Sequence, residues 1–429
     1  MKCFSNKIVF VCFSLVLTLT LCNHENSATT TCRLWSARRI IATFTVTGGA
    51  DKIKDSCPRN STEKKTIEIR GTIKTLYEDS VKNITNLFKI DLVKVGLEKI
   101  QPGTFKDLSP LMDLIIKENK LKTLKTGTFA NLNVSFLSLR RNYISVLQPG
   151  AFQNLSLYQL ALEENRLTKI RKGVFQDVSL TRLSSDQNGI SRLEPGVFGR
   201  LHPRNEEGVS LSLSDNKIER LDPQVFDNKD IDHVNLGNNS ISILHPGDLN
   251  NLPNLTRLNL TRNRLKEVPE GVFNASKIVI LDLSHNRISV IANGALDGMT
   301  GLWYIRIHHN QLKEWDSRWF RGLSMIKIFA SNNYIEVIRA GSFEELQEYT
   351  AVDLAHNQIR NISVGAFAGL KRLRSLDLSY NKITEWKIDF LEKVVIQENV
   401  DLRGNNITCS EIESGLQPLP DQGFIFDQC

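Results

Sequence analysis

The sequence predicts an α/β solenoid, a horseshoe of about 14 stacked repeats with a parallel sheet on its concave face. The first observation is a skeleton that is clearest in LDLSYNKITEW, residues 376–386, where leucines alternate before an asparagine. The second is its recurrence, because the asparagine position is filled thirteen times at steps of 23 or 24 residues, with a single step of 28. The third is the alternation itself, which is typical of a short strand with one apolar face. The asparagines are Asn119, Asn142, Asn165, Asn188, Asn216, Asn239, Asn263, Asn286, Asn310, Asn333, Asn357, Asn381 and Asn405.

An earlier copy at residues 87–100 has Val95 in the asparagine position and raises the number of repeats to fourteen. A fixed period in the twenties with this leucine pattern is the signature of a leucine-rich repeat. One half-apolar strand cannot bury its face alone, so stacked copies must share a continuous core. The asparagine amide carries donors and an acceptor, so we expect it to pair backbone groups where the chain turns out of the strand.

A phenylalanine follows most of these asparagines by ten residues. Its regular place indicates a second buried anchor in each repeat. We expect the rings to form a spine behind the strands, on the outer side of the horseshoe. The members are Phe105, Phe129, Phe152, Phe175, Phe198, Phe226, Phe273, Phe320, Phe343 and Phe367.

Residues 1–22 are typical of a secretory signal peptide. Lys2 and Lys7 give a basic start, and an apolar run over residues 8–21 follows them. A membrane anchor is the alternative, but the run is shorter than the roughly 20 residues that a span needs. No later stretch is apolar enough to cross a bilayer. We therefore expect a secreted protein of the extracellular space, with no membrane insertion.

Four of the seven cysteines lie outside this segment, and they flank the repeats: Cys32, Cys57, Cys409 and Cys429. Fourteen strands at about 4.8 Å per step separate the two ends by about 60–70 Å. A disulfide needs Cα atoms within about 7 Å. We therefore expect Cys32–Cys57 and Cys409–Cys429 to close the caps, each contributing about 3 kcal/mol. A link from Cys429 to a second chain stays open.

Zinc is the alternative for four cysteines, but the sequence has no C-x-x-C pair and the predicted compartment is oxidising. We predict no metal and no cofactor. The domains then run from a signal peptide at 1–22 and an N-terminal cap at 23–76 to the solenoid at 77–405 and a C-terminal cap at 406–429. Residues 40–46 and 65–69 are expected to be strands of the first cap, and the apolar segment 424–426 is expected to cover the other end.

The formal net charge of +7 falls to +5 once Lys2 and Lys7 are removed. Because the lysines and arginines are spread along the chain, we expect solvated surface charges and no nucleic-acid partner. Ten N-glycosylation sequons indicate a glycoprotein. Five of them (residues 83, 133, 154, 254 and 274) precede a strand by a similar interval and should share one edge of the sheet, whereas Asn259 should project from the concave face. The sequons are Asn60, Asn83, Asn133, Asn154, Asn238, Asn254, Asn259, Asn274, Asn361 and Asn406.

One repeat is irregular. Ser185 replaces the second strand leucine, and the long step that follows contains HPRNEEG at residues 202–208. A hinge or a binding loop is one interpretation. A tolerated surface insertion beside an underpacked strand is the other, and the pattern favours it.

The outward positions of the predicted strands are mostly small or polar, except in one region. Aromatic and basic side chains gather there on two adjacent strands, next to Ile280 and His285 on the strand before. Protein interfaces favour such residues, although single apolar residues on a surface are common and carry no meaning. The candidate partner-binding residues are Tyr304, Arg306, His308, His309, Lys327 and Phe329.

No catalytic residues are predicted, because no histidine, serine or aspartate stands in a nucleophile-elbow, zincin or phosphate-loop context. In a solenoid such residues recur with the repeat, so their proximity is generic. We therefore expect no enzyme activity.

The copies LDLSHNRISVI (281–291), VDLAHNQIRNI (352–362) and LDLSYNKITEW (376–386), with turns such as GSF at 341–343, resemble the typical subfamily of extracellular leucine-rich repeat proteins. That subfamily includes Toll-like receptor ectodomains, chaoptin-like adhesion proteins and secreted arthropod immune proteins. The resemblance covers about residues 67–405. It implies a horseshoe that binds other molecules. Toll-like receptors add a membrane span and the secreted immune group often adds a coiled coil. We expect neither here.

These observations predict a secreted recognition module for an extracellular protein or a glycan-bearing ligand, in innate immunity or complex formation. A homo- or heterodimer stays open. The alternative is a component of the extracellular matrix or of cell adhesion. An enzyme inhibitor is a third class, for which the sequence offers no positive sign.

Overall fold

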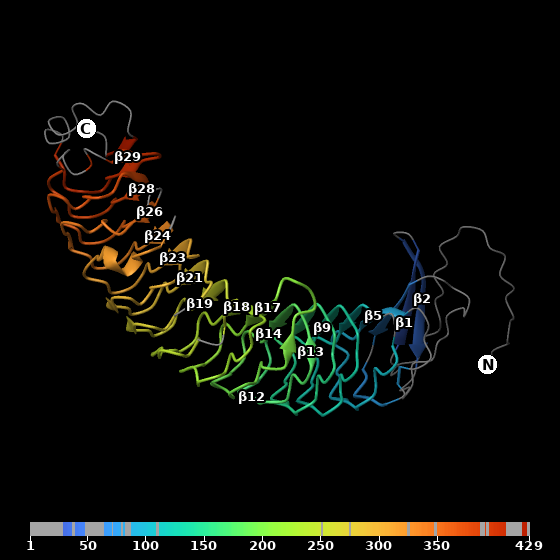
Figure 1. Cartoon of the computed structure of the whole chain (residues 1–429). Coiled ribbons are helices and arrows are strands. Elements are labelled where there is room, and N and C mark those ends of the chain that lie inside the picture. Colours follow the sequence, from blue (N-terminus) through green and yellow to red (C-terminus); the bar gives the residue numbers. More distant parts are fainter. Residues whose placement is uncertain are drawn as a thin grey trace, which may run out of the picture.

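The repeats coil into an arc whose inner side is lined by strands (Figure 1). The computed structural model describes residues 29–36, 39–47, 64–70, 72–78, 80–81, 87–108, 111–249, 252–273, 276–323, 327–346, 350–386, 391, 394–408 and 423–426. Within the first three of these ranges it describes the backbone and one side chain, that of Ile67.

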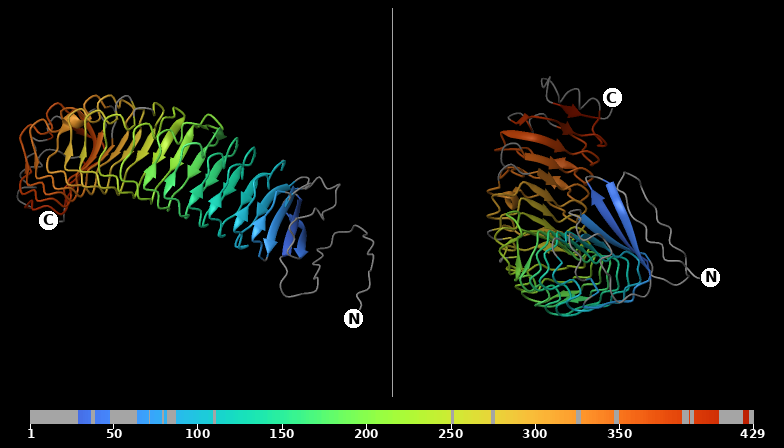
Figure 2. Two further views of the ribbon diagram at one scale, coloured as in Figure 1. Left: turned by 90° about the horizontal axis from the view of Figure 1, so that it is seen from below. Right: turned by 90° about the vertical axis from the view of Figure 1, so that its right-hand side faces the viewer.

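In the described part of the chain, nineteen strands form one sheet. From β3 onward neighbouring strands are parallel, and β1 pairs antiparallel with both β2 and β3. Figure 2 shows the strands side by side along the whole arc. They are β1 (Thr29–Ser36), β2 (Arg39–Thr47), β3 (Lys64–Arg70), β5 (Leu87–Asp91), β7 (Asp113–Ile115), β9 (Phe136–Ser138), β11 (Gln159–Ala161), β14 (Arg182–Ser184), β17 (Val209–Ser212), β18 (Ile231–Asn235), β19 (Arg257–Asn259), β21 (Ile280–Asp282), β23 (Tyr304–Arg306), β24 (Lys327–Phe329), β26 (Thr350–Asp353), β28 (Arg372–Asp377), β29 (Val395–Ile396), β30 (Val400–Asp401) and β31 (Phe424–Ile425).

Short strands also form after the chain has left the main sheet, and they pair two by two. Their brevity follows from the repeat, because a few residues run straight before the next turn. The pairs are β4 (Thr75–Leu76) with β6 (Lys99–Ile100), β8 (Thr123–Leu124) with β10 (Val146–Leu147), β12 (Lys169–Ile170) with β15 (Arg192–Leu193), β13 (Val178–Ser179) with β16 (Leu201–His202), β20 (Glu267–Val268) with β22 (Val290–Ile291), and β25 (Val337–Ile338) with β27 (Asn361–Ile362).

The helical half of the predicted α/β class is wrong for the described residues, which contain no α-helix. The outer side consists of turns and one 3-10 helix, η1 (Ser317–Phe320). A repeat of 23 or 24 residues leaves too short a return path for a helix of several turns. The parallel-sheet solenoid of about fourteen turns is confirmed.

The asparagine ladder has the predicted role. Asn286 accepts the Leu265 N–H at 3.0 Å and donates to the carbonyl oxygens of Leu260 and Leu283 at 2.9 and 3.0 Å. The same pattern recurs at Asn119 and at Asn405, near the two ends of the ladder. One amide thus pairs backbone groups of two consecutive repeats, which fixes how each turn stacks on the last.

The phenylalanine spine is also confirmed. Between Phe105 and Phe226 consecutive rings are stacked, with centroids 5.7–6.2 Å apart and planes within 17° of parallel. Leu249 and Leu296 take the spine position in two later repeats and are equally buried. Trp315 then packs against Phe320 and Phe343, which restores the aromatic contact.

Both ends of the sheet are extended by strands that do not belong to regular repeats. At the N-terminus, the predicted strands appear as β2 and β3, and β1 between them was not expected. At the C-terminus, β31 adds parallel to β30, and the Phe424 ring packs edge-on against Trp386 at 6.1 Å. The apolar segment 424–426 therefore lies on the end of the core, as the sequence predicted.

Candidate functional site

The six predicted partner-binding residues lie together on the inner face. We call Tyr304, Arg306, His308, His309, Lys327 and Phe329 the concave patch. They belong to β23, β24 and the turn after β23, in the C-terminal half of the arc (Figure 1). Parallel register places Tyr304 beside Lys327 and Arg306 beside Phe329. The 23-residue step between the two strands brings these side chains to one surface.

Three aromatic rings form the centre of the patch. The Tyr304 and Phe329 rings are nearly parallel, with centroids 6.4 Å apart. Trp303 stacks on Tyr304 at 6.2 Å and is 46% exposed. The sequence reasoning missed Trp303 because the residue precedes the strand, so it falls outside the strand alternation. Tyr304 and Phe329 are half-buried, so the row of stacked rings is partly open to solvent. Such a surface is suited to a packed contact with another molecule.

Two cations lie against this row of rings. The guanidinium of Arg306 is 5.8 Å from the Phe329 ring centroid, and the ammonium of Lys327 is 5.1 Å from that of Tyr304. Arg306 also lies 3.8 Å from a carboxylate oxygen of Asp282 on β21. These contacts hold the cations beside the rings before any ligand arrives. The patch therefore combines apolar area with positive charge.

Three imidazoles continue the patch along the turns. His285 stacks on His309 with centroids 4.3 Å apart, and His308 meets both rings edge-on at 5.4 and 5.5 Å. Burial lowers the pKa of the His308 imidazole below its ordinary value. Burial, and then the charge of His309, lower the pKa of His285. The ordinary pKa of about 6.5 already favours the neutral forms of His285 and His308 at pH 7.5. Because their pKa values are lowered, these two imidazoles stay neutral to a lower pH than an ordinary histidine does.

The sequence reasoning also missed a charged network in the N-terminal half of the groove. Arg140 and Arg141 both donate to Glu164, each through Nε at 2.7 Å. These guanidinium groups, Arg141 first, hold the pKa of Glu164 below its ordinary value. Beside them, burial raises the pKa of Glu163, one of whose oxygens has no hydrogen-bond partner in the described structure. The sequence did carry a sign of this network, because Arg141 and Glu164 occupy equivalent positions of successive repeats and have opposite charges.

The irregular repeat is held in place by hydrogen bonds. The Arg204 guanidinium donates to the Val134 carbonyl at 3.1 Å, and the Thr181 hydroxyl donates to the Asn205 side chain at 3.3 Å. Residues 203–208 therefore fold back over preceding repeats. Ser185 is buried and its hydroxyl has no partner among the described groups. A small, fully buried side chain thus fills the leucine position beside the insertion.

The sequons and cysteines are only partly described. Asn133, Asn154 and Asn254 are exposed and precede β9, β11 and β19, as the shared-edge prediction requires. Asn259 lies in β19, in register with Asp282 and two strands before Arg306. Asn238, Asn361 and Asn406 are also exposed. Outside the described residues lie Asn60, Asn83, Asn274, Cys57, Cys409 and Cys429, and the side chain of Cys32 is likewise not described.

The described ranges lack two further kinds of feature. They contain no helix with the length and apolar character that a membrane span needs. They also contain no group of three or more histidine, cysteine, aspartate or glutamate side chains arranged to hold a metal ion.

Comparison with solved structures finds the same fold in several proteins. The chain is 19% identical to Toll of Drosophila in the Toll–Spatzle complex. The structural match covers 79% of this chain and 50% of the Toll chain, with a TM-score of 0.57. For the LRIM1/APL1C complex the values are 18% identity, 83% of this chain, 62% of that chain and a TM-score of 0.53. For a leucine-rich repeat protein of Leptospira interrogans the identity is 21% and the TM-score 0.52, and the match covers 80% of this chain and 90% of that chain.

Comparison with curated protein sequences gave no significant match. The leucine-rich repeat family model matches residues 85–144, 133–190, 209–265, 253–312 and 327–383. These segments cover more than half of the chain and include the strands that carry the concave patch. On this repeat pattern and the solenoid that it builds, the chain belongs to the leucine-rich repeat proteins.

Proposed function

We propose that this protein is a secreted leucine-rich repeat glycoprotein that recognises an extracellular protein, or a glycan-bearing ligand, through the concave patch. The setting is extracellular innate immunity or complex formation, and the protein itself has no enzymatic role. The observation that carries the proposal is the stacked row of exposed Trp303 and half-buried Tyr304 and Phe329, with Arg306 and Lys327 against the rings. Exposed aromatic and arginine side chains are the usual anchors of protein interfaces.

The similar structures support this setting. Toll was determined with Spatzle, and LRIM1 with APL1C, so horseshoes of this fold occur in protein complexes. A sugar at Asn259 would lie two strands before Arg306 on the same face. It would direct a partner toward the C-terminal half of the groove. A homo- or heterodimer through this half is compatible with the same surface.

The test is capture of partners from extracellular fluid by the purified protein, followed by mass spectrometry. The double substitution Tyr304→Ala with Phe329→Ala should weaken capture at least tenfold, because truncating one interface anchor costs about 2 kcal/mol or more. The matched control is Phe136→Ala with Tyr158→Ala, two aromatic side chains of the N-terminal half, on β9 and just before β11. Undiminished capture by the first variant, with loss in the control, would place the site elsewhere.

A matrix or adhesion role is the second candidate. Retention of the protein on washed cells or matrix, with no partner recovered from fluid, would support that role.

Export would also oxidise the cysteines. We expect Cys32–Cys57 and Cys409–Cys429 to be local disulfides, each stabilising a cap by about 3 kcal/mol. Peptide mapping without reductant should find these two links. Recovery of Cys429 joined to a second chain would instead indicate a covalent dimer.

A further inference from the structure

A pocket of about 780 Å³ lies at the N-terminal end of the solenoid, far along the arc from the concave patch (Figure 1). Its ten lining residues come from four consecutive repeats: Thr75, Glu98, Lys99, Ile100, Gln101, Lys120, Lys122, Thr123, Lys125 and Tyr143. We call this hollow the lateral pocket. At about 4.8 Å per repeat, it extends roughly 15 Å along the solenoid.

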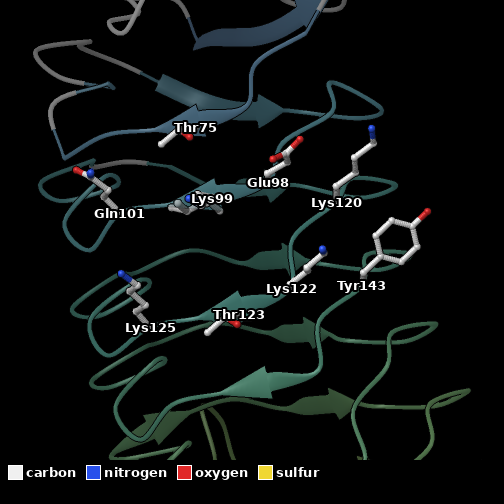
Figure 3. A pocket seen from close by; sticks show the side chains of 10 residues that line it. Thr75, Glu98, Lys99, Gln101, Lys120, Lys122, Thr123, Lys125 and Tyr143 are labelled. Carbon is white, nitrogen blue, oxygen red and sulfur yellow. The ribbon is translucent and has the colours of Figure 1, made fainter.

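The lateral pocket lies where the short-strand pairing is interrupted. β4 pairs with β6 and β8 pairs with β10, but among the described residues no backbone hydrogen bond joins 98–101 to 122–125. The same interruption occurs between β10 and β12. At the first of these gaps the lysines of neighbouring repeats line the opening, as Figure 3 shows.

The lining of the lateral pocket carries a net positive charge. It contains four lysines and one glutamate, a net charge of +3. Lys99, Lys120, Lys122 and Lys125 are all exposed, and in the part of the chain described here none of their ammonium groups has an ion pair or a hydrogen bond. Lys120, Lys122 and Lys125 are already close in the sequence, in KLKTLK at residues 120–125, and the fold adds Lys99 from the preceding repeat.

The arrangement fits an extended ligand with several anionic groups. In Figure 3, Lys120, Lys122, Glu98 and Tyr143 lie on one side of the hollow, Gln101 and Lys125 lie on the other, and Lys99 and Thr123 lie between them. The ammonium groups are therefore spread over the hollow and do not converge on one point. Hydroxyl, amide and carboxylate groups stand between them.

We propose that the lateral pocket is a second binding site, which takes a sulfated polysaccharide. Lysines supply point charges for sulfates, and no arginine for bidentate phosphate recognition lines the hollow. Sugar hydroxyls can donate to Glu98 and accept from Thr75, Thr123 or Gln101, so both charge and hydroxyl groups of such a ligand find partners.

A single-stranded nucleic acid fits less well. Such ligands stack successive bases on several aromatic side chains. The lateral pocket has one aromatic residue, Tyr143, and the Arg166 guanidinium already lies 4.3 Å from the centroid of its ring. The choice of a polysaccharide over intracellular polyanions rests on the secretion proposed above. The charge argument itself does not.

The test measures heparin binding to the purified full chain by surface plasmon resonance at several salt concentrations. Lys99→Gln with Lys122→Gln and Lys125→Gln should weaken binding about tenfold, because several exposed charge contacts are lost together. The matched control is Lys169→Gln with Lys217→Gln and Lys266→Gln, three exposed lysines of later repeats. It removes the same charge and should change binding less than about twofold.

Equal weakening in both triple variants, or none in the first, would overturn the proposal. Desulfated heparin should not bind, and single-stranded poly(U) RNA should compete poorly. Competition by poly(U) as strong as by heparin would assign the lateral pocket to nucleic acid. Circular dichroism of the Lys99, Lys122 and Lys125 triple variant shows whether weaker heparin binding is due to misfolding. Unchanged partner capture by the same variant shows that the lateral-pocket proposal is tested independently of the concave-patch proposal.

Discussion

Asn286 illustrates how one side chain holds a turn. Its amide is the described partner of the Leu265 N–H and also binds the carbonyls of Leu260 and Leu283. Asn286→Ala should lower the free energy of unfolding by about 2–3 kcal/mol, because a buried donor is left unpaired. Urea unfolding followed by circular dichroism measures the loss. Asn293→Ala, at an exposed asparagine, is the control and should stay within about 0.5 kcal/mol of the parent.

Glu163 gives a prediction with a pH dependence. Burial raises the pKa of its carboxyl, so the charged form that exists at pH 7.5 opposes folding. Glu163→Gln should therefore increase stability at pH 7.5 by about 0.5–1 kcal/mol. The gain should fade as the pH falls toward about 4.5, because the parent carboxyl then takes up a proton and loses the penalty.

The neighbouring Glu164→Gln is the control of opposite sign. Arg141 and Arg140 lower the pKa of Glu164, so its charge supports the fold at neutral pH and that support is lost as pH falls through the lowered pKa. The measurement compares the urea midpoints of both variants with that of the parent at pH 7.5 and at pH 4.5. A loss of stability in Glu163→Gln at pH 7.5 would contradict the assignment.

Single residues also show where sequence reasoning stopped. The residue before each ladder asparagine has a left-handed backbone, for example φ 54° at His285 and 53° at His309. Residues as different as glutamate, arginine and histidine fill this position, so composition gives no sign of it. The asparagine was predictable because its amide chemistry is needed. The residue before it was not, because only its backbone is constrained.

At the scale of structural elements, the spine stabilises neighbouring repeats. Phe152 stacks between Phe129 and Phe175, with centroids 5.8 and 5.9 Å away. Phe152→Ala should cost about 3–4 kcal/mol, whereas Phe152→Leu should cost clearly less, since leucine occupies the spine at Leu249.

Hydrogen exchange gives a local measure of the Phe152 substitutions. Protection should fall first in the repeats around residues 129–175, because each repeat packs its core mainly against its two neighbours. Tyr158→Ala, at a residue that is 40% exposed, serves as the control and should leave that protection unchanged. A uniform loss over all repeats would contradict a spine that acts between neighbours.

The two surfaces differ in how far the sequence could predict them. The concave patch was predictable, because a fixed repeat length and strand alternation bring Tyr304 and Phe329 onto one face. The lateral pocket was not. Lys99 and Lys122 occupy different positions of the repeat, and their approach depends on where the short-strand pairing opens. Periodicity predicts what recurs, and an interruption of pairing does not recur in every repeat.

At the scale of the whole molecule, the solenoid is a chain of shared hydrogen bonds. The Leu283 carbonyl accepts from Asn286 of its own repeat and from Asn310 of the next repeat. With one asparagine removed, that buried oxygen keeps one partner. With both removed, it has none, and the full cost of an unpaired carbonyl appears only then.

Adjacent and distant ladder substitutions should therefore combine differently. Asn286→Ala with Asn310→Ala should lose more stability than the sum of the single variants, by about 0.5–1.5 kcal/mol. Asn142→Ala with Asn357→Ala shares no hydrogen-bond partner and should be additive within about 0.5 kcal/mol. Urea unfolding of the singles and doubles gives both coupling energies. Equal coupling energies in the two pairs would contradict stabilisation through hydrogen bonds shared by adjacent repeats.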